Sequence, residues 1–145
     1  MVNSERTLRY EDAPRADHFA GDPRVTTLIV DDQIAFREAL AELIDAMPGF
    51  VLVGRACTGE EAVAAVEQMS PQLVLMDVAM PGMGGIAAAR VILGRYPRIV
   101  IVLIFIDNPA LYPEARDLCR GVVACARKQD LRPSQLRRVW EQHHT

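Results

Sequence analysis

Short apolar runs alternate with amphipathic segments along most of the chain. The apolar runs are rich in Val, Ile and Leu, and they predict strands over residues 25–32, 50–56, 72–77, 99–106 and 122–126. The segments between them carry apolar residues at helical spacing. They predict helices over residues 34–47, 58–68 and 85–96, with two more that open at Pro113 and Pro133. The order of elements is therefore five β/α units.

The predicted strands lack the polar alternation of a sheet that has one face in water. Residues 99–106 are apolar throughout, as expected of a strand that is covered on both faces. We predict an α/β fold, with a doubly wound five-stranded parallel sheet between two layers of helices. Ligands of such sheets gather at the carboxyl ends of the strands, so a functional site is expected there.

Composition and charge narrow the class of protein. Residues 1–24 are polar and aperiodic, and they predict a flexible N-terminal arm before one domain at 25–142 and a tail at 143–145. The net charge of −3 offers no basic surface for nucleic acid. No apolar stretch predicts a signal peptide or a membrane span. We therefore expect a cytoplasmic protein with no membrane or nucleic-acid partner of its own, whose three cysteines (Cys57, Cys119 and Cys125) are free thiols.

Charged residues stand at the ends of three predicted strands. Asp31 and Asp32 end the first strand, Asp77 ends the third, and Lys128 follows the fifth. These ends converge in a doubly wound sheet, where three carboxylates repel one another unless a cation joins them. Such oxygen ligands suit Mg²⁺, and a carboxylate beside Mg²⁺ can attack a phosphoryl group. Taken singly, each acid could merely cap a helix or begin a turn.

Lys128 favours the interpretation as a phosphoryl site. It is the only lysine among the sixteen basic residues. A compact ammonium on a flexible stem can reach one phosphoryl or carboxylate oxygen as a point charge. By itself, a lysine after a strand could equally be a solvated surface residue.

These residues resemble a known family, the receiver domain of two-component response regulators. The resemblance rests on "LIVDD", "LVLMDVAMPGMGG" and the single lysine after the fifth strand, and it covers about residues 25–142. The segment "DDQIAFREAL" is similar to the subgroup that often carries a LuxR-type DNA-binding output domain. The resemblance implies the flavodoxin-like (βα)5 fold and a role in two-component signal transduction, with transcription as the expected output.

The resemblance also implies a role for each site residue. Asp77 would accept a phosphoryl group from a sensor histidine kinase, with Mg²⁺ as cofactor. Asp32 would bind the metal directly and Asp31 mainly through water, while Asp77 and the backbone carbonyl of Ala79 would complete the protein ligands. Lys128 would contact the phosphoryl group. A homodimer is a further expected assembly, and an output domain would lie outside this chain.

Two features of the family are missing. The family places Ser or Thr at the end of the fourth strand, a position that falls on Ile104, Phe105 or Ile106, and no Ser or Thr occurs between Pro71 and Pro133. The family's switch aromatic falls on Cys125. These departures predict intact phosphoryl chemistry beside an atypical switch.

Three hypotheses therefore compete. The first is an atypical receiver that is phosphorylated at Asp77 and signals through a modified route. The second is a pseudo-receiver, a protein-interaction module that works without phosphorylation. The third is a small phosphatase, which we do not expect because position 79 is Ala and offers no general acid. We accordingly expect a signalling protein and not an enzyme.

Overall fold

The computed structural model describes residue 21 and residues 23–107, 109–115 and 123–144. Most of the predicted arm, residues 1–20 and 22, lies outside the described residues. The five strands are β1 (Val25–Val30), β2 (Phe50–Ala56), β3 (Leu73–Asp77), β4 (Val100–Phe105) and β5 (Val123–Arg127). The α-helices are α1 (Ile34–Asp45), α2 (Gly59–Met69), α3 (Gly84–Arg95) and α5 (Pro133–His143). Short 3₁₀ helices are η2 (Pro109–Leu111), η3 (Pro113–Ala115) and η4 (Lys128–Asp130).

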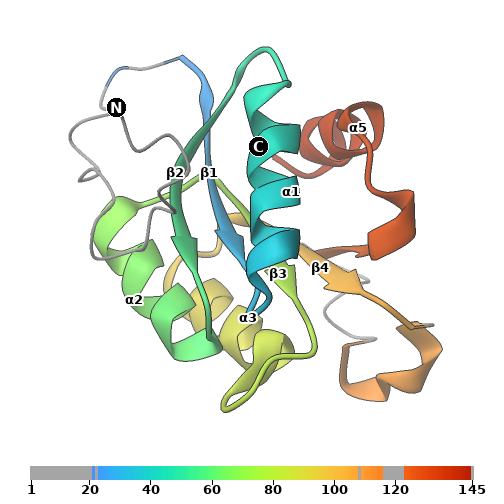
Figure 1. Cartoon of the computed structure of the whole chain (residues 1–145). Helices are drawn as coiled ribbons and strands as arrows, with labels where there is room; N and C mark the ends of the chain where they lie inside the picture. Colours follow the sequence, from blue (N-terminus) through green and yellow to red (C-terminus); the bar gives the residue numbers. More distant parts are fainter. Residues whose placement is uncertain (1–20, 22, 108, 116–122, 145) are drawn as a thin grey trace, which may run out of the picture.

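The strands form one parallel sheet in the order β2-β1-β3-β4-β5. Helices α2 and α3 cover one face, and α1 and α5 cover the other (Figure 1). The predicted doubly wound five-stranded sheet is therefore confirmed. The winding reverses between β1 and β3, which makes the carboxyl ends of these two strands the place where a ligand of this fold is expected.

Burial explains why these segments form their elements. All six residues of β4 are buried, as the continuous apolar run predicted. Helix α2 begins with a capping box, in which the hydroxyl of Thr58 accepts a hydrogen bond from the amide of Glu61. The carboxylate of Glu61 in turn accepts one from the amide of Cys57. These local signals fix the start of α2 beside the sheet.

Three details differ from the sequence expectations. Ile34, the first residue of α1, has the apolar side chain expected of a core-facing position in this helix but is 60% exposed. Pro113 opens a 3₁₀ helix of three residues, and residues 116–122, where the rest of a fourth helix was expected, lie outside the described residues. Cys125 is disulfide-bonded, so the expected free thiol is wrong for this residue, whereas Cys57 keeps its thiol and Cys119 lies outside the described residues. An odd count of cysteines excludes complete pairing but not the pairing of two.

Among the described residues, no helix is both long and apolar enough to cross a membrane.

Candidate functional site

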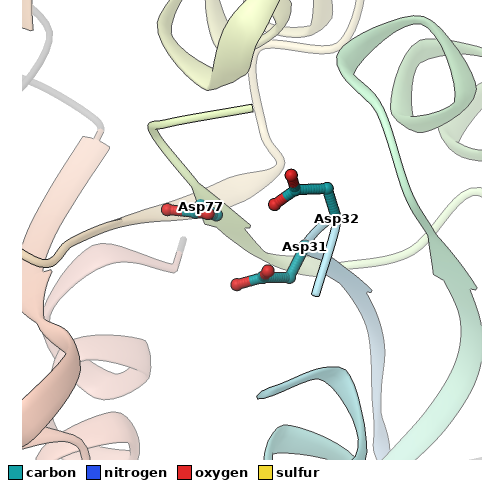
Figure 2. Close-up of side chains that lie close together, drawn as sticks. All are labelled: Asp31, Asp32 and Asp77. Carbon is teal, nitrogen blue, oxygen red and sulfur yellow. The ribbon is translucent and has the colours of Figure 1, made fainter. Parts of the chain in front are cut away.

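Three carboxylates meet at the carboxyl ends of β1 and β3. Asp31 and Asp32 directly follow β1, and Asp77 is the last residue of β3. The two strands pair up to Val30 and Met76, so the next residue of each strand emerges at the same edge. One oxygen from each carboxylate lies within 4.8 Å of the others (Figure 2). The structure thus brings together the three acids that the sequence predicted.

Asp77 is held in an unusual electrostatic environment. The Asp77 side chain is almost fully buried, since the residue is 2% exposed. The pKa of its carboxyl group is raised from 3.8 to about 6, first by burial and next by the nearby charge of Asp31. Lys128 and the amide of Ala79, which donates a 3.2 Å hydrogen bond to Oδ1, oppose this rise in the pKa. Without a cation the pocket therefore disfavours a charged Asp77.

Lys128 extends into the same pocket from η4, directly after β5. Its Nζ lies 3.2 Å from Asp31 Oδ2 and 3.8 Å from Asp77 Oδ2. The lysine side chain is only 13% exposed, so these ion pairs are weakly screened by water. The predicted convergence of Lys128 with the acids at this edge is therefore present in the structure.

The donor set fits a divalent cation. Three carboxylates face one ammonium, which leaves a net charge of −2 when all are ionised. Asp31 is fully buried, yet its Oδ2 accepts no hydrogen bond, although Lys128 lies nearby as an ion pair. Asp32 is exposed and open to an incoming ligand. Hard oxygen ligands with positions left open for water are what Mg²⁺ requires.

Backbone groups of two loops shape the pocket. The amide of Gln33 donates a 2.8 Å hydrogen bond to Asp31 Oδ1 and so orients this buried carboxylate. The loop after β3 turns back so closely that a Cβ on Gly85 would lie 2.2 Å from the carbonyl oxygen of Asp77. Only glycine fits at that position. Ala79, expected as a carbonyl ligand, is exposed and takes part in the pocket here through its amide.

The end of β4 offers only apolar side chains to this site. Ile104 pairs with Asp77 on one side and with Ala126 on the other, so among the three candidate positions it is the one in register with Asp77. Ile104 is fully buried, whereas Ile106 is 53% exposed. Phe105 packs instead on the other face of the sheet, 5.2 Å from the ring of Tyr112. Cys125 packs against the same cluster as Phe105.

Sequence reasoning missed two residues of α1 that contact the site. The ring of Phe36 lies beneath Lys128, with Nζ 4.1 Å from the ring centroid. The buried guanidinium of Arg37 donates a 2.7 Å hydrogen bond from Nη1 to the carbonyl oxygen of Asp31. Helical spacing indicates which residues share a face, but it does not reveal a contact between Phe36 and a lysine 92 positions later in the chain.

Comparisons with known proteins agree with this geometry. The family model described as the response regulator receiver domain matches residues 27–112. The transcriptional regulatory protein LiaR of Bacillus subtilis (strain 168) is 35% identical over 91 residues, which cover 61% of this chain and 43% of LiaR. A protein-glutamate methylesterase/protein-glutamine glutaminase of Geobacter metallireducens is 42% identical over 79 residues, or 54% of this chain and 23% of that enzyme. The chain thus spans less than half the length of these relatives.

Comparison with solved structures also indicates a response regulator receiver domain. A two-component response regulator of the LuxR family from Aurantimonas sp. SI85-9A1 superimposes with a TM-score of 0.70 at 26% identity, covering 82% of this chain and 84% of that one. Because the family model spans more than half of the chain and the fold agrees with it, this chain belongs to the response regulator receiver domain family.

Proposed function

We propose that this receiver domain accepts a phosphoryl group at Asp77, with Mg²⁺ as cofactor and a sensor histidine kinase as donor. The observation that carries the proposal is the convergence of Asp31, Asp32, Asp77 and Lys128 at one strand-end pocket. Asp77 supplies the nucleophile, Asp31 and Asp32 supply metal ligands together with the Ala79 carbonyl, and Lys128 supplies a positive charge for the phosphoryl oxygens.

The chemical step is a transfer between two protein side chains. A carboxylate oxygen of Asp77 attacks the phosphorus, the P–N bond of the donor phosphohistidine breaks, and the imidazole leaves with the electron pair. Bound Mg²⁺ would neutralise charge on the transferred group. Lys128 would hold one phosphoryl oxygen, and the buried position of Asp77 limits access of water to the acyl phosphate. We propose that the chain itself performs no catalysis on other substrates.

We further propose that the phosphorylated domain signals by a modified route. An apolar residue at the hydroxyl's position makes no contact that depends on the phosphoryl group, and a ligand without a differential contact cannot shift an equilibrium. Ile104 is the residue in register with Asp77, and it is apolar and fully buried. Signalling through altered dimerisation or partner docking, with transcription as the output of an attached DNA-binding domain, remains consistent with that arrangement.

The same observation supports a second candidate function. A receiver that has Ile104 in place of a hydroxyl-bearing residue beside Asp77 could act as a pseudo-receiver, which binds a partner in one fixed conformation. Incubation with acetyl phosphate and Mg²⁺, followed by intact-mass measurement, separates the two functions. We expect the wild type to gain one phosphoryl group and Asp77→Asn to gain none. An unmodified wild type would favour the pseudo-receiver.

A further inference from the structure

Among the described residues, two different kinds of group contact the ammonium of Lys128. The first kind comprises the carboxylates of Asp31 and Asp77, at 3.2 and 3.8 Å. The second is the face of the Phe36 ring, with its centroid 4.1 Å from Nζ. This distance is well inside the range of about 6 Å in which a cation and an aromatic face attract each other. Lys128 is thus held by an uncharged partner as well as by charged ones.

The Phe36 ring is fixed by the fold. Phe36 lies in the first turn of α1, is half-buried, and packs against the apolar cluster between α1, α5 and the sheet. Lys128, by contrast, begins a 3₁₀ helix of three residues, and its ammonium is carried on a flexible four-carbon stem. The better anchored of the two groups is therefore the ring.

The two kinds of neighbour respond differently to a metal ion. A divalent cation in the pocket would bind the carboxylates of Asp31 and Asp77, which are the two that pair with Lys128. An aromatic face does not compete for Mg²⁺, which takes oxygen ligands. The contact with Phe36 is the one that survives when the carboxylates turn to the metal.

We propose that Phe36 is a positioning residue, which keeps the Lys128 ammonium at the mouth of the pocket while Mg²⁺ occupies the carboxylates. This inference rests on the proposed function of Asp77 as phosphoacceptor. Phe36 acts through Lys128 and touches neither the metal nor the phosphoryl group. Its removal frees the lysine head to move into water, and the positive charge for the transferred group is lost in part.

The single lysine makes the contact directly measurable. Lysine labelled with ¹³C at Cε gives one side-chain signal in this chain, provided that any tag lacks lysine. Protons above an aromatic face resonate upfield, so we expect the Lys128 Hε signal to be displaced upfield in the wild type and to return to the random-coil position in Phe36→Leu. Phe36→Tyr should keep the displacement. The proposal requires that the displacement persists at saturating Mg²⁺, and its disappearance on Mg²⁺ addition would overturn it.

Kinetics of phosphorylation supply the second test. At saturating Mg²⁺ and with acetyl phosphate as donor, we expect Phe36→Leu to lower the rate constant about three- to tenfold. Phe36→Tyr should stay within about twofold of the wild type, since its ring also offers a π face. In a Lys128→Met background, Phe36→Leu should have no further effect. An equal loss in both backgrounds would reduce Phe36 to a packing residue and overturn the proposal.

Controls separate this inference from the proposed function. Leu43→Ala removes another half-buried side chain of α1 and should leave the rate unchanged. Thermal unfolding checks that each variant is folded. If the wild type accepts no phosphoryl group, the proposed function fails, while the Hε signal with and without Mg²⁺ still decides whether Phe36 holds Lys128.

Discussion

The ends of β1 and β3 carry three carboxylates, two of which form ion pairs with Lys128, whereas the end of β4 carries Ile104, Phe105 and Ile106. The first region has the groups needed to bind a cation and to accept a phosphoryl group. The second has no polar side chain that could respond to one. Both regions lie at the same edge of one sheet, in adjacent strands. The fold therefore allows the chemistry of phosphoryl acceptance and its conformational readout to be specified by separate residues.

The largest effect is expected from removing the nucleophile. Asp77→Asn should reduce phosphoryl uptake from acetyl phosphate to background, because a neutral amide oxygen is a much weaker nucleophile toward phosphorus than a carboxylate oxygen. Asp107→Asn is the matched control, since Asp107 is an exposed acid just beyond β4 and should leave uptake unchanged. Intact-mass spectrometry after acid quenching gives the measurement. Equal uptake by Asp77→Asn would place the acceptor elsewhere.

Loss of the lysine should have the next largest effect. Lys128→Met removes the positive charge that faces Asp77, and we expect phosphorylation to slow roughly 10²-fold, the usual cost of one electrostatic group at a reacting centre. Arg127→Met, one residue earlier and exposed, removes the same charge outside the pocket and serves as control. A comparable slowing in both variants would point to net charge as the cause.

The pKa of Asp77 predicts a pH dependence of stability in metal-free buffer. Folding raises this pKa from 3.8 to about 6, so the folded protein binds more protons than the unfolded chain between these values. The unfolding free energy contributed by this group therefore falls as pH rises from about 4 to about 6. Asp77→Asn should remove that slope and be more stable than the wild type at pH 7, by about 1–3 kcal/mol. Urea unfolding at several pH values tests this, and an unchanged slope in the variant would contradict it.

Introducing a hydroxyl at the end of β4 tests whether its absence is what separates this strand from the phosphoryl site. Ile104→Val should cost about 1 kcal/mol of unfolding free energy through the lost methyl group. Ile104→Thr has the shape of the valine variant and should cost about 1–2 kcal/mol more, because the hydroxyl is buried beside apolar neighbours. When beryllofluoride and Mg²⁺ are added, the threonine variant alone should extend its NMR shift changes along β4. Identical responses of the two variants would mean that the hydroxyl is not what the wild type lacks.

The acidic pocket and the end of β4 show which parts of the structure can be predicted from the sequence. The strands and the acidic pocket were predictable because parallel winding sends the ends of β1 and β3 to one edge, so Asp31 and Asp77 had to meet. The sequence does not decide which of Ile104, Phe105 and Ile106 stands in register with Asp77, since register depends on pairing between strands and not on the run of apolar residues.

The exposure of single side chains and the contacts between distant segments could not be predicted from the sequence for a different reason. Helical spacing indicates which residues of α1 share a face, but it does not show how much of that face is covered, and Ile34 is 60% exposed. The contacts of Phe36 with Lys128 and of Arg37 with the Asp31 carbonyl join α1 to distant segments or to the preceding loop. The disulfide of Cys125 likewise depends on three-dimensional proximity. Such contacts arise from the packing of segments that are distant in the sequence, so no local sequence pattern predicts them.

The most direct test of the account follows the backbone amides of ¹⁵N-labelled protein while beryllofluoride is titrated in the presence of Mg²⁺. We expect Mg²⁺-dependent shift changes at the amides of Gln33 and Ala79, which donate to the pocket carboxylates, and at that of Asp77 itself. We expect no change at Phe105 and Tyr112, which pack on the other face of the sheet. Unmoved amides at Asp77 and Ala79 would contradict phosphoryl acceptance. Shift changes that reach Tyr112 would contradict the separation of the chemistry from its readout.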